Sequence, residues 1–388
     1  MKLTRRLYCG AMTRGLSLYL DVLRLWAAFM VLLAHWAFPR FTGGDHLWMR
    51  RHDLGGDGVV IFFVLSGLLI SFAAERRRDE GAGLFAVDRF SRLWSVAIPA
   101  LIFCYVLDLI GQSAMPDIYA AVGYQGGVSL EALLSGATFT NQIWFWNIQP
   151  GSNGPYWSLG YEAWYYLIFA LFFFAKGNWR WVLAGTAALI AGPKIALLAP
   201  SWLIGVWVWQ VIKSGRLQAL SRTLAWTLLI APLVFYFIAH SSFLHWQLRA
   251  VSEGWFGPEG MALLGPSDTF LWSAVLGVLT GAHVLGAAAV FSGEAKPVGV
   301  KLETAVRWVA GGSFALYLIH FPVMHFAGAL LPGGIEDTWR QGFLLLIPIL
   351  VSYVFAEVSE RRRPALRAWM RQQVQNVGLL QKLEKSRA

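Results

Sequence analysis

Three side chains that can carry charge lie in the first long apolar segment of the sequence. Asp21, Arg24 and His35 fall within residues 16–38, and a charge at membrane depth costs about 2.5–3.5 kcal/mol on insertion scales. Arg24 and His35 are separated by close to three helical turns, so they share one helix face about 16 Å apart. An imidazole suits general base chemistry near neutral pH. Alternatively, Arg24 pairs with Asp21 and extends to the headgroups, while His35 lies at the membrane interface.

Two arginines stand at the start of a later apolar segment. Arg89 and Arg92 are three residues apart, and residues at this spacing share a helix face. Paired guanidinium groups can bind phosphate oxygens through bidentate hydrogen bonds. The alternative is that both side chains only anchor the chain at the cytoplasmic membrane surface.

Glu162 is a carboxylate within an aromatic and apolar segment. No Lys or Arg lies three or four residues from it, and a carboxylate at membrane depth needs a partner. The intramembrane candidates of suitable type are Arg24, His35 and His320. We therefore expect another helix to bring one of these three close to Glu162.

His320 stands two residues before Pro322. Proline has no backbone N–H and disfavours helical geometry at the preceding residue, Phe321. We expect a break at this point that leaves His320 at an unwound, polar position; the alternative is a kinked helix with an interfacial histidine. His325 is expected to be interfacial.

The composition shows which elements must position these residues. Of the 388 residues, 57% are hydrophobic and 14% are charged, whereas soluble domains have about 25% charged residues. The 20 Trp residues suit membrane–water interfaces. These values exclude a soluble enzyme, a disordered chain and a disulfide scaffold, and they indicate a multi-pass membrane protein.

Ten apolar segments are candidates for membrane-spanning helices, each of which needs about 20 residues. We predict an all-α, polytopic bundle of about ten transmembrane helices in residues 1–357, followed by a basic cytoplasmic tail in residues 358–388. The boundary between the fifth and sixth segments, near Pro193, is the least defined. The segments are 16–38, 59–74, 93–110, 157–175, 181–192, 195–212, 224–239, 270–291, 309–327 and 342–356.

The distribution of positive charge predicts the topology. With the N-terminus in the cytoplasm, 25 of the 32 Lys and Arg residues fall on the cytoplasmic side and 6 on the other, as the positive-inside rule requires. Both termini are therefore predicted to be cytoplasmic. This asymmetry accounts for the net charge of +10 without a nucleic-acid partner. The tail is expected to lie as a basic helix on anionic membrane lipid.

Five short motifs in this order resemble those of acyltransferase family 3, membrane enzymes that O-acylate carbohydrates and related acceptors. The resemblance extends from residue 17 to about residue 360. Departures from the family pattern are Val60, Ala163 and the sequence that follows Glu360. The motifs are the pair Arg24 and His35, the segment 58–67, the segment 88–92, Trp157-Ser158-Leu159 with Glu162, and Tyr317-Leu318-Ile319-His320-Phe321-Pro322.

The resemblance implies acyl-coenzyme A, usually acetyl-coenzyme A, as a donor that arrives from the cytoplasm. No permanently bound cofactor and no metal site are expected. A carbohydrate or glycan would be the acceptor, and the location would be a cell membrane, the inner membrane of a bacterium. The implied roles are catalysis by His35, Glu162 and Arg24, donor binding by Arg24, Arg89 and Arg92, and substrate binding by His320, Tyr317, Trp157 and Ser158.

Two other classes of protein fit parts of the pattern. A transporter or flippase of a sugar or lipid-linked sugar also has many spans, intramembrane charges and a helix broken by proline. A membrane scaffold without catalytic activity fits less well, because histidines and carboxylates at membrane depth are costly. The sequence does not order the roles of Glu162 and His320, either of which can orient His35 or receive the acceptor.

Overall fold

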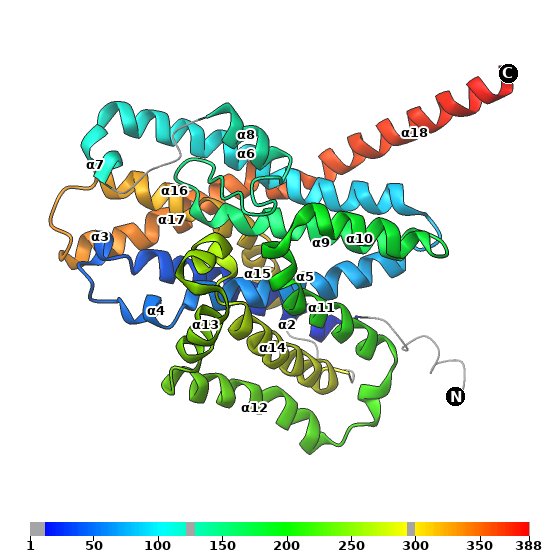
Figure 1. The fold of residues 1–388 in the computed structure, drawn as a ribbon, viewed down its shortest axis with the longest axis horizontal. Coiled ribbons are helices and arrows are strands. Elements are labelled where there is room, and N and C mark those ends of the chain that lie inside the picture. The colour runs from blue at the N-terminus through cyan, green and yellow to red at the C-terminus, as the bar shows by residue number, and fades with distance from the viewer. Residues whose placement is uncertain (1–11, 122–128, 293–298, 388) are drawn as a thin grey trace.

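The computed structural model describes residues 12–121, 129–292 and 299–387, and these ranges contain helices but no strand (Figure 1). Shorter helices and 3-10 turns are α3 (Pro39–Thr42), α4 (Trp48–Arg51), α7 (Pro116–Ala121), α8 (Leu130–Ala137), α15 (Val300–Ala310), η1 (Gly154–Tyr156), η2 (Arg216–Ala219), η3 (Gly265–Ser267) and η4 (Glu360–Arg362). The longer helices are α2 (Arg14–Trp36), α5 (Leu54–Arg76), α6 (Ala82–Ala114), α9 (Trp157–Phe174), α10 (Trp179–Ala191), α11 (Pro193–Lys213), α12 (Arg222–Ser241), α13 (Leu244–Leu264), α14 (Phe270–Val290), α16 (Ser313–Leu330), α17 (Thr338–Val358) and α18 (Arg363–Arg387).

In the described part of the chain, eight helical stretches are long and apolar enough to cross a membrane. They confirm an all-α, multi-pass membrane protein. Helices α9 and α10, which contain two of the predicted spans, are not among the eight. The count of ten and the cytoplasmic position of both termini therefore stay predictions, as does the domain boundary at residue 358.

Helix α5 lies at the centre of the bundle and packs against α2, α9, α11 and α14. It is apolar around its whole circumference, as expected of a helix with neighbours on all sides. Gly67 of α5 and Gly205 of α11 allow the two backbones to touch. A Cβ at Gly67 would lie 2.0 Å from the carbonyl oxygen of Trp202, and one at Gly205 would lie 1.9 Å from that of Val64. Small residues such as these allow close helix approach in lipid.

Glycine also separates α10 from α11. Gly192 has φ +89°, and a Cβ there would lie 2.6 Å from the Cα atom of Trp144. The left-handed backbone ends α10, and Pro193 then begins α11 with its preset φ. The boundary expected near Pro193 therefore exists.

Helix α13 was not predicted from the sequence. Residues Leu244–Leu264 fall between the predicted spans 224–239 and 270–291, within a predicted outer connection. The helix also contains a non-helical residue, Gly257, with φ 66°, followed by Pro258. Helix α13 packs against α12 and α14, and these tertiary contacts stabilise a helix that the local sequence does not favour.

The expected break at Pro322 is wrong. Helix α16 is continuous from Ser313 to Leu330 with Pro322 inside it. It packs against α2, α6 and α17, and packing of this kind allows a membrane helix to retain a proline. His325 is also buried, with an exposed fraction of 4%, and stacks edge-on against Tyr119; its expected position at the membrane interface stays a prediction.

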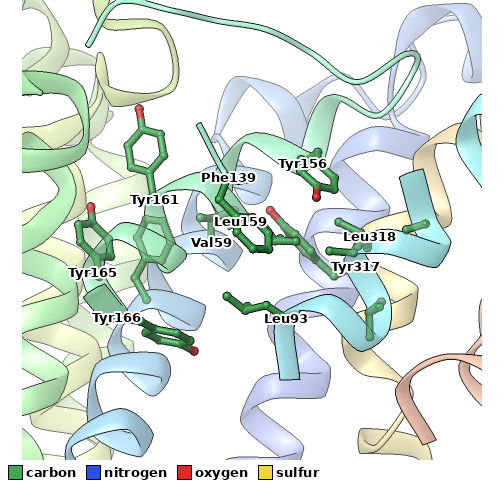
Figure 2. Packing of buried hydrophobic residues seen from close by; sticks show 14 of the residues in the cluster. Val59, Leu93, Phe139, Tyr156, Leu159, Tyr161, Tyr165, Tyr166, Tyr317 and Leu318 are labelled. Atoms are coloured by element: carbon green, nitrogen blue, oxygen red, sulfur yellow. The ribbon is translucent and has the colours of Figure 1, made fainter. Parts of the chain in front are cut away.

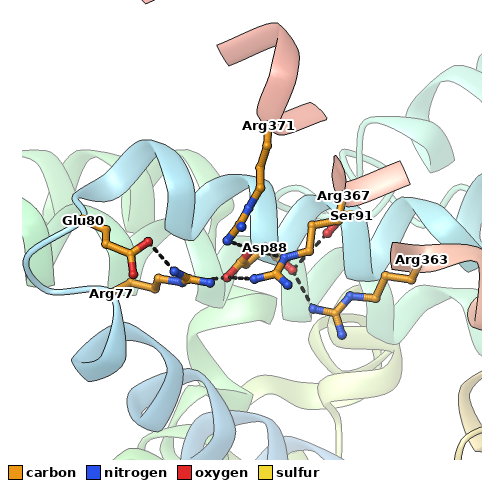
Figure 3. A network of polar contacts seen from close by, with 7 residues as sticks. All are labelled: Arg77, Glu80, Asp88, Ser91, Arg363, Arg367 and Arg371. Carbon is orange, nitrogen blue, oxygen red and sulfur yellow. Dashed lines mark hydrogen bonds and ion pairs between the residues drawn. The ribbon is translucent and has the colours of Figure 1, made fainter. Parts of the chain in front are cut away.

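The basic tail forms α18, which projects from the bundle towards its C-terminal end (Figure 1). Its first turns contact α6: Arg367 and Arg371 form ion pairs with Asp88. Arg363 donates to the backbone carbonyl of Asp88 at 3.2 Å, and Arg77 pairs with the same carboxylate from the other side at 2.9 Å (Figure 3). The predicted position of the tail on anionic lipid stays a prediction.

Candidate functional site

A small cavity lies where α2, α5, α6, α9 and α16 meet, and we call it the arginine cavity. It encloses ≈ 50 Å³ and is lined by residues that include Arg24, Arg92, Ser66, Ser158 and Glu162. Four of these five residues were singled out from the sequence. The fold thus brings both arginines and the carboxylate of Glu162 to one point.

The two arginines differ in their partners. Arg24 donates to Asp21 at 3.1 Å and to the carbonyl oxygen of Ala310 at 3.2 Å. Asp21 also accepts from Arg307 at 3.1 Å. Arg92 forms no hydrogen bond or ion pair with any residue that the structure describes, although it lines the cavity. Its guanidinium group therefore keeps its donors available for an anion.

Arg89 lies one helical turn before Arg92 and, as the spacing predicts, both belong to α6. Arg89 is not part of the cavity lining. Its Nε atom is buried and has no hydrogen-bond partner among the described residues. Its guanidinium group lies 5.9 Å from the ring centre of Phe85. The two arginines thus stay neighbours on α6, but only Arg92 lines the cavity.

Glu162 receives hydrogen bonds from two neutral hydroxyl groups. Ser66 of α5 donates to Oε1 at 2.6 Å, and the hydroxyl group of Tyr166, one turn along α9, donates to the same oxygen. Trp202 of α11 donates to the Oγ atom of Ser66 at 3.3 Å. Three helices thus hold one carboxylate oxygen in place.

The expectation that another helix brings Arg24, His35 or His320 close to Glu162 is met by Arg24, although the direct hydrogen-bond donors to the carboxylate are other residues. Arg24 shares the cavity with Glu162, but neither Arg24, His35 nor His320 forms a hydrogen bond or ion pair with it. The sequence reasoning considered only ionisable partners. A hydroxyl group satisfies a carboxylate without the cost of burying a second charge.

A second cavity, which we call the His35 cavity, encloses ≈ 310 Å³. Its lining includes His35 of α2, Arg50 of α4, Trp157 of α9 and two carboxylates, Asp53 and Asp268. Burial and the neighbouring carboxylate of Asp57 raise the pKa of Asp53 to about 7. The cavity combines an imidazole, an aromatic ring and several hydrogen-bonding groups.

His35 and His320 lie in contact. Nε2 of His320 is 3.2 Å from Nδ1 of His35. Nδ1 of His35 is also 2.8 Å from the carbonyl oxygen of Val31, and Nδ1 of His320 is 2.9 Å from that of Leu316. A carbonyl oxygen only accepts, so each neutral ring carries its proton on Nδ1.

This tautomer leaves Nε2 of His35 as the unprotonated nitrogen. It has no hydrogen-bond partner within the described ranges, and His35 lines its cavity. His320 is fully buried and lines neither cavity. The second imidazole thus lies behind the first and fixes the position of its Nδ1–H.

Tyr317 lines both cavities, as do Val59 and Phe63. The Tyr317 hydroxyl group donates to the carbonyl oxygen of Pro155 at 3.0 Å and lies 2.6 Å from Oγ of Ser158. Figure 2 shows Tyr317 beside Leu159 of α9 within the main hydrophobic cluster. The phenol ring therefore lies at the boundary between the two cavities.

Several residues of the two cavities were not found from the sequence. Arg50, Asp53 and Asp268 lie in connections between predicted spans, where charged residues are common. Ser66 was interpreted only as a small residue for helix packing. Ser66 could have been identified because a buried carboxylate without a charged partner needs a hydrogen-bond donor from a neighbouring helix.

Glu360 was also missed. Its carboxylate accepts a hydrogen bond at 3.1 Å from the backbone N–H of Ala315, in the first turn of α16. The first N–H groups of a helix have no partner within the helix, and a negative charge is favoured there. Glu360, which the sequence analysis placed in the tail, therefore fixes the start of the helix that carries Tyr317 and His320.

The fold and the two cavities define a class: a multi-pass helical membrane protein with ionisable and nucleophilic groups gathered between its helices. A family model described as an acyltransferase domain matches residues 17–357 of the 388. The chain therefore belongs to acyltransferase family 3 and is a membrane acyltransferase. No curated protein and no solved structure matched the chain in the other two comparisons.

Proposed function

We propose that this membrane acyltransferase moves an acetyl group from acetyl-coenzyme A, supplied on the cytoplasmic side, to a hydroxyl group of a carbohydrate or glycan. The observation that carries the proposal is the pair of cavities that share Tyr317. One contains arginines for an anionic donor and the other contains a histidine base. A transfer reaction needs two substrates to meet at one point, and the two cavities do so at this tyrosine.

Arg24 and Arg92 are the donor-binding residues in this proposal. Both line the arginine cavity, and guanidinium groups bind phosphate oxygens with planar, bidentate geometry. Arg89, one turn further from the cavity along α6, extends the basic surface for the phosphates. The cavity of ≈ 50 Å³ holds only one or two water-sized groups, at about 30 Å³ each. Its side chains must therefore separate when the thioester enters.

His35 is the catalytic residue, and Nε2 is the atom that acts. It takes the proton of the acceptor hydroxyl group while that oxygen attacks the thioester carbonyl carbon. The C–S bond then breaks, and the sulfur of coenzyme A leaves as a thiolate that takes up the proton. The other route is that Nε2 first accepts the acyl group and then passes it to the hydroxyl group. His320 is a positioning residue in both routes, because it contacts only Nδ1 of His35.

The lining of the His35 cavity supports a carbohydrate acceptor. Trp157 offers an aromatic face, while Arg50, Asp53 and Asp268 offer donors and acceptors for hydroxyl groups. Its ≈ 310 Å³ is within the lower range of small-molecule sites. Glu162 lies on the arginine side, where its fixed charge helps to orient Arg24 and Arg92.

The test uses purified protein in lipid vesicles with the tail facing outward. Acetyl-coenzyme A is added outside, oligosaccharide acceptors are loaded inside, and free coenzyme A and acetylated sugar are measured by thiol titration and mass spectrometry. The proposal predicts equal amounts of both products. In cells, surface polysaccharides should lose their acetyl substitutions when the gene is deleted. Release of coenzyme A without any acetylated sugar would overturn the assigned acceptor.

The same vesicles distinguish a transporter or flippase. Such a protein would accumulate a sugar across the membrane with no coenzyme A consumed. The broken helix that favoured this alternative does not exist, because α16 is continuous through Pro322.

A further inference from the structure

Three histidines gather away from the two cavities, at the ends of segments that are far apart in the sequence. His52 follows α4, His240 lies in the last turn of α12, and His245 lies in the first turn of α13. One ring nitrogen from each lies within 4.8 Å of those from the other two. We call these residues the three-histidine cluster.

The hydrogen bonds of the cluster select one tautomer for two of the rings. Nε2 of His240 is 2.8 Å from Oδ2 of Asp57, and Nε2 of His245 is 3.0 Å from the carbonyl oxygen of Arg51. Both oxygens accept, so both Nε2 atoms carry a proton, and in the neutral form of each ring Nδ1 then has a lone pair. The Nδ1 atoms of all three histidines are buried and have no hydrogen-bond partner among the described residues.

Leaving three ring nitrogens buried without a partner is costly, at about 1–3 kcal/mol each. A single cation bound by all three ring nitrogens satisfies them together. Histidines that bind a metal through one nitrogen usually donate the other N–H to a carboxylate or a backbone carbonyl, which fixes the ring. Asp57 and the carbonyl of Arg51 supply those two kinds of acceptor to His240 and His245.

Asp57 adds the charge that a cation site needs. It is fully buried and accepts from Tyr236 at 2.7 Å and from Trp272 at 2.7 Å, as well as from His240. No Lys or Arg side chain within the described ranges pairs with it. A buried carboxylate surrounded only by neutral donors favours a positive charge nearby.

We propose that His52, His240 and His245 bind one Zn²⁺ ion, with Asp57 as the outer partner that orients His240. Three neutral imidazoles suit Zn²⁺ and leave its fourth position for water. The three ring nitrogens are at most 4.8 Å apart. If each ring moves inward by less than about 1 Å, all three nitrogens reach the Zn–N distance of about 2.0–2.1 Å.

The ion would join the α12–α13 hairpin to the connection that precedes α5. The hairpin turns at Phe243, which has a positive φ of 55°, and His52 is followed directly by Asp53 of the His35 cavity. The bound ion therefore stabilises one wall of that cavity without touching its contents. This role is separate from the acyltransferase reaction, so a measurement of metal binding tests the site independently of the proposed function.

The test measures metal content of the full chain, purified in detergent with an affinity tag that contains no histidine. After incubation with Zn²⁺ and removal of free metal, mass spectrometry of the wild type should give about one zinc per chain. His52→Ala, His240→Ala and His245→Ala should each retain less than about a tenth of that amount. Co²⁺ bound in place of zinc should show the visible absorption of a tetrahedral site.

His46→Ala is the matched control. His46 lies in the same connection as His52 but stacks on Trp36 and is outside the cluster, so this variant should keep its zinc. His52→Ala removes no hydrogen bond seen in the described residues, so its gel-filtration profile should match that of the wild type and show that it folds. A folded wild type that takes up no zinc or cobalt, or equal metal content in His46→Ala and His52→Ala, overturns the proposal.

Discussion

The two cavities that meet at Tyr317 differ in size and in charge. The arginine cavity encloses ≈ 50 Å³ and is lined by two guanidinium groups and a carboxylate, whereas the His35 cavity encloses ≈ 310 Å³. Under the proposed function the narrow basic cavity is the donor side, which widens when the thioester arm enters. The wide cavity, with mixed charges and an aromatic wall, is the acceptor side. The proposal thus gives one substrate to each cavity, and variants of the residues that line one cavity should affect only its own substrate.

The largest effect is expected for His35→Ala. It removes the base of the wide cavity, and general base catalysis contributes about 10²–10⁴-fold to rate. Coenzyme A release in the presence of acceptor should fall by that factor, while binding of acetyl-coenzyme A, measured by calorimetry, should stay within about twofold. His46→Ala, on the same side of the molecule, should keep its activity. A His35→Ala enzyme with more than half of the wild-type rate would contradict the assignment.

Arg92→Lys should affect the donor and spare the acceptor. Hydrogen bonds to charged groups contribute about 1.5–3 kcal/mol, so the KM for acetyl-coenzyme A should rise roughly 10–100-fold with little change in the KM for the acceptor. Lysine keeps the charge but loses the planar pair of donors. Steady-state kinetics with each substrate varied in turn give both constants.

The control for Arg92 is Arg367→Lys. Arg367 is already paired with Asp88 and touches neither cavity, so the same exchange should leave both KM values unchanged. An equal rise in the donor KM for both variants would show that basic charge at this end of the protein acts without regard to position. Figure 3 makes the contrast visible, because every arginine drawn there already has a carboxylate or carbonyl partner.

Tyr317→Phe tests the point that the cavities share. The variant loses the bond to the carbonyl of Pro155 and the contact with Ser158, each worth about 0.5–1.5 kcal/mol. We expect a moderate fall in kcat, roughly threefold to tenfold, with little change in either KM. Tyr353→Phe also loses a hydroxyl-to-carbonyl bond, at 2.8 Å to Val309, but lines neither cavity. It should lose stability and keep kcat; matching kcat values for the two variants would refute a role for Tyr317.

Much of the fold followed from hydropathy, because a span must be apolar along its whole length. Prediction failed where tertiary contacts decide the outcome. Pro322 was expected to break α16, yet neighbouring helices keep it continuous, and α13 forms although Gly257 and Pro258 interrupt it. Local sequence rules describe an isolated segment and carry no information on which neighbours will pack against it.

The candidate site, like the fold, could be predicted only in part. His35, Arg24 and Glu162 were identified from residue type alone, since ionisable groups at membrane depth are costly. Asp21 was also named as a partner of Arg24, but the partners of Glu162 were not found, because Ser66 and Tyr166 look like ordinary packing residues until α5 and α9 are placed side by side. The contact of His35 with His320 likewise depends on α2 lying against α16.

The smallest effect is expected from Glu303→Gln. Glu303 lies in α15, outside the lining of the arginine cavity. Hydrogen bonds from Arg14 and Arg307 hold the pKa of Glu303 below its ordinary value of 4.5. Its stabilising contribution is therefore fully present above that value and is lost as the pH falls through the lowered pKa. Scanning fluorimetry should give a Tm about 1–2 °C below wild type at neutral pH, and the gap should close as the pH falls from 4.5 through the lowered pKa. A difference in Tm that stays constant with pH would mean that the substitution acts through packing and not through the charge of Glu303. Transfer activity should be unchanged, because Glu303 lines neither cavity.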